Sequence, residues 1–93
     1  MRVVEERMLN AVRNHQSRSL GNTQGVVDGN ICKVYLHGNK IYEKNYADGT
    51  EMFSNAGWYS NTTRSRLNAL GANIYQKNWT WYNYDGTIWV NDF

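Results

Sequence analysis

The sequence predicts a single small α+β domain spanning residues 1–93. An N-terminal helix, an antiparallel β-meander of four strands, a short second helix and a C-terminal three-stranded meander ending in a hairpin follow one another. Three observations predict this order: a helical apolar period near the N-terminus, four dipeptides typical of tight hairpin turns, and a short segment with helix start and stop signals. With 93 residues and no change of composition, the chain has room for one modest core.

The first 16 residues are predicted to form an amphipathic helix. Apolar side chains recur at helical spacing, and charged side chains fall towards the other side. The apolar set is Val4, Met8, Leu9, Ala11 and Val12, and the charged set is Glu5, Glu6, Arg7 and Arg13. Residues 17–24, SRSLGNTQ, break this period and are predicted to be a polar connector.

The segment 25–54 is predicted to be a β-meander because it contains three two-residue turn signals, Asp28-Gly29, Gly38-Asn39 and Asp48-Gly49. This register places Val27 opposite Asn30, Leu36 opposite Ile41, and Val34 opposite Glu43. A one-residue slip exchanges the two faces of a strand. The expected core face carries Cys32, Val34, Leu36 and Ile41, and the expected aromatic and basic face carries Lys33, Tyr35, Tyr42, Lys44 and Tyr46.

Residues 61–71 are predicted to form the second helix, which Asn61 or Thr62 caps and Gly71 ends. Leu67 and Leu70 are its expected buried positions. Residues 73–91 are predicted to form the last meander, with a turn at Asp85-Gly86. That turn sets Tyr82 opposite Trp89 and Trp81 opposite Val90.

Composition restricts the classes of partner and compartment. The formal net charge is +2 and the pI is near 8.8, a mildly basic balance that neither requires nor excludes nucleic acid. The single Cys32 excludes an intramolecular disulfide and indicates a reducing compartment. No apolar run has the length of a membrane span, and the first residues lack the apolar core of a signal peptide. We therefore expect a cytoplasmic protein with no membrane partner.

No catalytic motif is recognisable. Asp28, Asp48 and Asp85 each precede a glycine, which is typical of turns. The spacing of His15 and His37 in the sequence, relative to each other and to Cys32, is not typical of metal ligands. Nucleotide-binding and nucleophile-elbow motifs are absent. We expect no enzyme, no cofactor and no metal site.

Four segments, GNT, VYLHGNKI, AGWYSNTTRSRLNALG and IYQKNWTWY, resemble in this order a family of small tailed-phage proteins. LHGN, TTRSRLNAL and the downstream QK carry most of the resemblance, which covers most of the chain. It implies a viral origin and the cytoplasm of an infected bacterium as the place of action. It implies no catalytic residues.

Two functions are consistent with these residues. The first is binding to a host protein, as an inhibitor or a factor for host takeover or anti-defence, through aromatic anchors. Its candidate residues are Trp79, Trp81, Trp89, Tyr35 and Tyr42. The alternative is nucleic-acid binding by a helix and hairpin that resemble a winged helix. Its candidate residues are Arg64, Arg66, Asn68, Lys77, Lys33 and Lys44. A minor structural protein is a third open class, and the sequence does not decide the oligomeric state.

Overall fold

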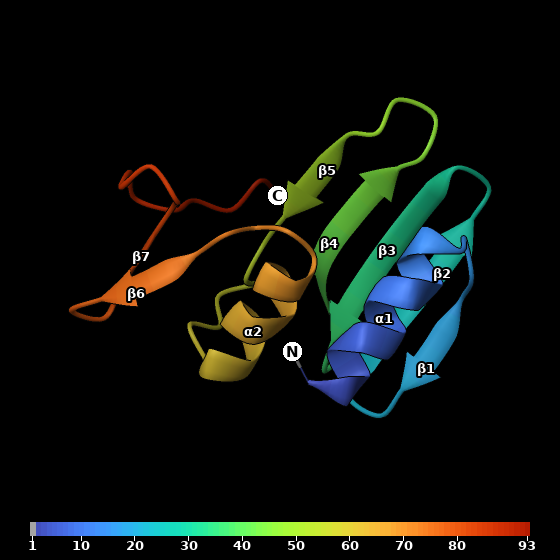
Figure 1. Cartoon of the computed structure of the whole chain (residues 1–93), viewed down its shortest axis with the longest axis horizontal. Coiled ribbons are helices and arrows are strands. Elements are labelled where there is room, and N and C mark those ends of the chain that lie inside the picture. The colour runs from blue at the N-terminus through green and yellow to red at the C-terminus, as the bar shows by residue number, and fades with distance from the viewer. Residues whose placement is uncertain (1) are drawn as a thin grey trace.

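A five-stranded antiparallel sheet forms the body of the structure, with two helices and a separate two-stranded hairpin beside it (Figure 1). The computed structural model describes residues 2–93, so Met1, the first residue of the predicted helix, lies outside the described residues. The strands follow the order β1 to β5 across the sheet, and α1 lies over one face. The elements are α1 (Val3–Arg13), β1 (Arg18–Leu20), β2 (Thr23–Asp28), β3 (Ile31–Leu36), β4 (Asn39–Asn45), β5 (Glu51–Phe53), α2 (Asn61–Ala69), β6 (Tyr75–Lys77) and β7 (Thr80–Tyr82). The α+β class is confirmed, whereas the strands divide into five and two instead of four and three.

The helix α1 buries its apolar stripe together with one acid. Met8, Ala11 and Val12 are buried, as their spacing predicts. The prediction that Glu5 faces solvent is wrong, because its side chain is also buried. Glu5 lies three residues before Met8, on the same side of the helix. Arg66 of α2 compensates the buried carboxylate.

The predicted connector 17–24 contains an additional edge strand, β1. It pairs with β2 from Arg18 opposite Gly25 to Leu20 opposite Thr23. Just before it, the Ser17 hydroxyl accepts a hydrogen bond from a β2 backbone N–H at 2.8 Å. β1 is three residues long and mostly exposed, so it has no apolar alternation that could distinguish it from a loop.

The β2–β3 hairpin turns one residue later than predicted. Asp28 pairs with Ile31, so the turn residues are Gly29 and Asn30, and Val27 faces Cys32 instead of Asn30. Gly29 adopts the positive φ of +58° that such a turn requires. The partner of Val27 shifts by two residues, which keeps every side chain on its predicted face.

A β-bulge changes which side chains of β4 face the core. The β3–β4 turn lies at His37-Gly38, one residue earlier than predicted, so Leu36 lies opposite Asn39 and not opposite Ile41. Beyond the bulge Val34 lies opposite Tyr42, not opposite Glu43 as predicted. Ile41 and Tyr42 are consequently both buried although they are adjacent in the chain. The prediction that Tyr42 lies on the outer face is therefore wrong. The four predicted core positions, Cys32, Val34, Leu36 and Ile41, are confirmed.

The turns at Asp48 and Asp85 are both closed by the same local hydrogen bonds. Asp48 accepts from the backbone N–H and the hydroxyl of Thr50 at 2.9 and 2.7 Å. Asp85 accepts from the same groups of Thr87 at 3.0 and 2.6 Å. These bonds hold the pKa of both carboxyl groups below the usual value for aspartate. The Asp48-Gly49 loop is longer than predicted, because the N–H of Asn45 donates to the carbonyl of Thr50 across it.

The helix α2 has clear start and stop signals. Ser60 is its N-cap, one residue before the predicted Asn61, and its hydroxyl accepts from the N–H of Thr63 at 3.1 Å. At the other end, the N–H of Gly71 donates to Asn68 and that of Ala72 to Leu67. This pair of bonds is a Schellman motif, with Gly71 at φ +105° as the predicted stop. Leu67 and Leu70 are buried, as predicted.

The last segment forms one hairpin, not a three-stranded meander. β6 and β7 pair across a two-residue turn at Asn78-Trp79, which the sequence analysis missed. At Asp85-Gly86 only an isolated bridge between Tyr82 and Ile88 forms, so the predicted pairing of Tyr82 with Trp89 is wrong. Local hydrogen bonds within the 83–87 loop replace a regular ladder there. The hairpin projects from the side of α2 that faces away from the sheet (Figure 1). Within residues 2–93, no helix is both long and apolar enough to cross a membrane.

Candidate protein-binding surface

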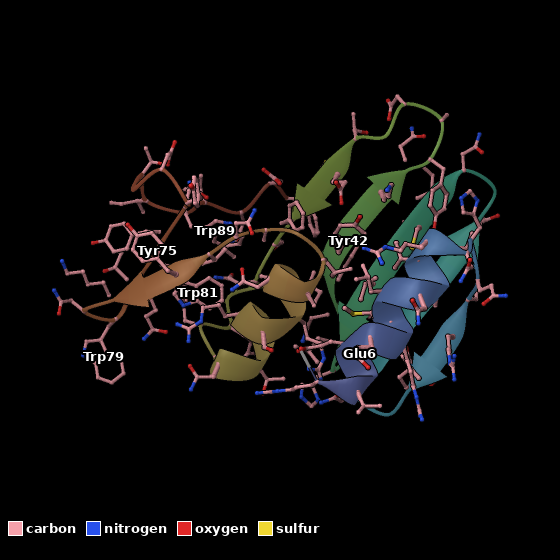
Figure 2. All side chains as sticks on the ribbon, in the orientation of Figure 1. Glu6, Tyr42, Tyr75, Trp79, Trp81 and Trp89 are labelled. Atoms are coloured by element: carbon pink, nitrogen blue, oxygen red, sulfur yellow. The ribbon has the colours of Figure 1, made fainter. Side chains whose placement is uncertain are left out.

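The predicted aromatic anchors divide into buried and exposed side chains. Trp81 and Trp89 are only 2% and 7% exposed, so both belong to the core. Trp81 packs edge-on against Tyr59 and at a tilt against Trp89, with ring centroids 5.1 and 5.5 Å apart. These contacts fix the C-terminal segment to the hairpin. Figure 2 shows Trp79, in contrast, pointing away from the body of the molecule at the hairpin tip.

The predicted aromatic and basic face of the sheet does not exist as one surface. Tyr42 lies in the core, and its hydroxyl donates to a carboxylate oxygen of Glu51 at 2.5 Å. Burial, and then the adjacent Glu51 carboxylate, raise the pKa of Tyr42 far above the usual value. The Tyr46 hydroxyl donates to the carbonyl of Val12 on the helix-covered side. Half-buried Tyr35 belongs to the other side of the sheet.

The predicted phosphate-binding residues are also separated. Lys33 lies opposite Glu43 and Lys44 lies opposite Cys32, so the two lysines face different sides of the sheet. Asn68 bridges α2 to the following segment: its amide donates to the carbonyl of Ile74 at 2.8 Å, and its carbonyl accepts the N–H of Ile74 at 2.6 Å. Both polar groups of Asn68 are thus engaged within the chain.

Arg66 is the clearest departure from the predicted nucleic-acid site. Its side chain is 4% exposed and forms an ion pair with Glu5 at 2.7 Å. Its Nε also donates to the hydroxyl of Thr23 at 3.0 Å. In this arrangement the guanidinium joins α2 to α1 and β2 and is not available to a phosphate. Arg64 and Lys77 remain as the accessible cations near the hairpin.

Trp79 combines high exposure with an unfavourable backbone conformation. The side chain is 89% exposed at the turn, and its φ is +66°. The preceding Asn78 also has a positive φ, of +51°, as a type I′ turn requires at both central residues. Asparagine tolerates this conformation, whereas a bulky residue at positive φ is strained and glycine is preferred. The indole makes little contact within the chain that could offset the strain.

We define the hairpin surface as Asn61, Arg64, Gln76, Asn78 and Trp79, which line a shallow depression of about 410 Å³ between α2 and the hairpin. Arg64 donates to the amide oxygen of Gln76 at 2.7 Å, which ties β6 to α2. On β6 the half-exposed ring of Tyr75 stacks on Tyr82, with centroids 5.5 Å apart. The hydrogen bond to α2 and the stacked tyrosines therefore stabilise the hairpin that carries the indole of Trp79.

The chemistry of the hairpin surface suits recognition. Its lining consists of three side-chain amides, one guanidinium and one indole, with no acid among the residues that line it. Amides and a guanidinium donate hydrogen bonds at the edge of a contact, and an indole supplies a large apolar area. Among residues 2–93, no three histidine, cysteine, aspartate or glutamate side chains gather as a metal site.

Two functional features escaped the sequence analysis. The Asn78-Trp79 turn lacks the glycine that marks a type I′ hairpin, and only Asn78 could have suggested it. The pairing of Glu5 with Arg66 joins residues 61 positions apart, and no local pattern indicates such a contact.

Comparisons with known proteins locate the chain among phages. A family model described as Kyanoviridae Gp96 protein matches residues 1–93. Neither the comparison with curated proteins nor the comparison with solved structures found a significant match. The family match confirms the viral origin implied by the sequence resemblance. The chain belongs to the Kyanoviridae Gp96 protein family, a family of cyanophage proteins.

Proposed function

We propose that this phage protein is a non-enzymatic binding protein that attaches to a host protein through the hairpin surface and inhibits or redirects it. The observation that carries the proposal is the conformation and exposure of Trp79. A residue that strains its own backbone and contributes little to the core does not serve the stability of the fold. Such local conflicts between sequence and fold concentrate at functional sites.

A protein partner fits this surface because of the kind of side chains present. Tryptophan is enriched among the residues that dominate binding energy in protein interfaces. The amides of Asn61, Gln76 and Asn78 surround the depression beside the indole, as polar groups surround an apolar anchor in many interfaces. The proposed place of action is the interior of the infected cell, where a small binding protein meets host proteins.

Nucleic acid is the second candidate, and one observation favours it. Arg64 and Lys77 lie on α2 and β6 near Trp79, whose exposed indole could stack on an unpaired base. Two accessible cations supply little of the phosphate attraction that dominates nucleic-acid affinity. We therefore rank this function below protein binding.

Affinity capture tests the proposal with the full chain as bait and a cyanobacterial host lysate, with and without nuclease. The variants are Trp79→Gly, which suits the turn, and Tyr84→Ala as a control. Tyr84 is 87% exposed but lies in a different loop. We expect a host protein at stoichiometric amount that survives nuclease, is retained by Tyr84→Ala, and is lost with Trp79→Gly. Capture that disappears with nuclease supports the second candidate. Equal capture of one partner by both variants excludes the hairpin surface.

A further inference from the structure

A second hollow lies at the start of α2 and shares no residue with the hairpin surface. It has a volume of about 450 Å³, within the usual range for small-molecule sites. Leu36, Ile41 and Trp58 supply apolar walls, and Ser60 and Thr63 lie at the helix start. Apart from Asn55, its lining comes from the segments VYLHGNKI and AGWYSNTTRSRLNALG, which the fold brings together.

Asn55 is among the residues that line this cavity, and one hydrogen-bond donor of its side chain has no partner among the described residues. Its side chain is fully buried, and its Oδ1 accepts the N–H of Gly57 at 2.8 Å. Its own N–H donates to Oδ1 of Asn91 at 2.8 Å. The bond from Gly57 fixes which end of the amide is the oxygen. The remaining group, Nδ2, has no acceptor among the described residues.

A buried amide donor without an acceptor is unfavourable and uncommon in folded proteins. Ser60 Oγ and Thr63 Oγ1, which belong to residues that line the same cavity, lie 2.8 Å apart and share a hydrogen bond with each other. Aspartate, glutamate, lysine and arginine are absent from the residues that line the cavity. A charged ligand would therefore lose its hydration without gaining a counterion.

We propose that this cavity binds a small neutral ligand with an apolar body and a carbonyl group. The carbonyl oxygen accepts from Asn55 Nδ2, and the apolar body contacts Leu36, Ile41 and Trp58. The assignment is independent of the protein-binding function, because the two sites share no residue.

NMR titration of the isotope-labelled full chain tests this site with three probes. Acetophenone has a ring and a carbonyl, ethylbenzene has the ring alone, and benzoate is charged. We expect acetophenone to shift the Asn55 side-chain amide and the Trp58 indole in a saturable way. Acetophenone should bind about 3- to 10-fold more tightly than ethylbenzene, the effect of one neutral hydrogen bond, and benzoate should not bind, because no lysine or arginine lines the cavity.

Two variants add independent readouts. Asn55→Asp keeps the acceptor for Gly57 and removes the donor, so the preference for acetophenone over ethylbenzene should disappear. Thr62→Phe narrows the cavity from a half-exposed position and should abolish binding of both probes. The comparison of probes on the unmodified chain needs no variant to fold. Equal affinities there, or shifts that do not saturate at cavity residues, overturn the proposal.

Discussion

Glu5 of α1 and Arg66 of α2 form an ion pair 2.7 Å long in which the side chains are only 2% and 4% exposed. The carboxylate also accepts from the hydroxyl of Ser65 at 2.6 Å and from the backbone N–H of Arg2 at 3.2 Å. Each charge is therefore compensated by a partner and by further hydrogen bonds, as a buried pair requires. The pair joins two helices whose paired residues are 61 positions apart in the sequence.

Removing one member of this pair should be strongly destabilising. Arg66→Met leaves the carboxylate of Glu5 buried without a counterion, and we expect the free energy of unfolding to fall by about 3–5 kcal/mol. Urea denaturation followed by circular dichroism measures it. Arg64→Met is the control on the same helix, where a half-exposed side chain should cost about 1 kcal/mol or less. The double variant Glu5→Leu/Arg66→Met should recover most of the loss, since it leaves no unpaired charge. A double variant as unstable as Arg66→Met contradicts this account.

The same pair predicts a loss of stability in acid. Burial by itself raises the pKa of Glu5, but hydrogen bonds from Ser65, Arg66 and Arg2 outweigh it, so the folded-state pKa lies below the usual value. The stabilisation is complete above the unfolded pKa of about 4.3 and is lost as pH falls through the folded pKa. The stability of the wild-type chain should therefore decrease below about pH 4.3, and that of Glu5→Gln should decrease less. Urea midpoints across this range measure the difference, and parallel curves would contradict the prediction.

Features set by local sequence were predictable, and features set by distant contacts were not. The core residues of β3 and the Gly71 stop of α2 follow from apolar alternation and from glycine geometry, and both are confirmed. The burial of Arg66 depends on Glu5, 61 residues earlier. Tyr42 became a core residue because a bulge added one residue to β4. The Gly38-Asn39 signal also misplaced the starting register, since Leu36 pairs with Asn39 and not with Ile41, and a turn signal does not reveal a bulge further along the strand.

The inward face of α2 is tested by Leu67, which has no solvent exposure. Leu67→Ala should lower the free energy of unfolding by about 2–5 kcal/mol, because a buried leucine leaves a cavity that cannot fully collapse. Leu9→Ala removes the same atoms from a half-buried position on α1 and should cost clearly less. Thermal unfolding of both variants gives the comparison. Equal midpoints for Leu67→Ala and the wild-type chain would show that this face was misassigned.

The four tryptophans illustrate why composition alone did not identify the binding residues. Trp81 and Trp89 pack on each other, whereas Trp79 occupies a turn and Trp58 borders the second cavity. Because all four are tryptophan, the composition of the chain gives no reason to prefer one of them as a binding residue. What distinguishes the exposed indole of Trp79 from the other tryptophans is its place in the turn at residues 78 and 79, which has no glycine.

Backbone strain at Trp79 predicts an unusual stability effect. Trp79→Gly relieves a positive φ that costs about 1–2 kcal/mol for a residue with a side chain, although glycine adds about 0.4–1 kcal/mol of chain entropy in the unfolded state. We expect a net gain of about 0–1.6 kcal/mol in the free energy of unfolding. Trp79→Ala is the matched control, because it removes the exposed indole and keeps the strain. If glycine is no more stable than alanine, the turn is not strained.

Salt dependence separates the two candidate functions for whatever complex is captured. If Arg64 and Lys77 contact phosphates, each contact releases condensed counterions, and two contacts give a log–log slope of affinity against salt of about −1.4 to −1.8. Lys77→Gln should then flatten the slope by about 0.7–0.9.

If Trp79 anchors a protein partner, salt should have a small effect on affinity, and Trp79→Gly should weaken binding by about 2 kcal/mol or more, roughly 30-fold. Arg66 is neutralised by Glu5, so it should not contribute to the slope in either case. We expect the shallow slope and the large effect of Trp79, since the hairpin surface carries one strained, exposed indole and only one cation, Arg64. A steep slope together with full binding by Trp79→Gly would reverse the ranking of the two functions.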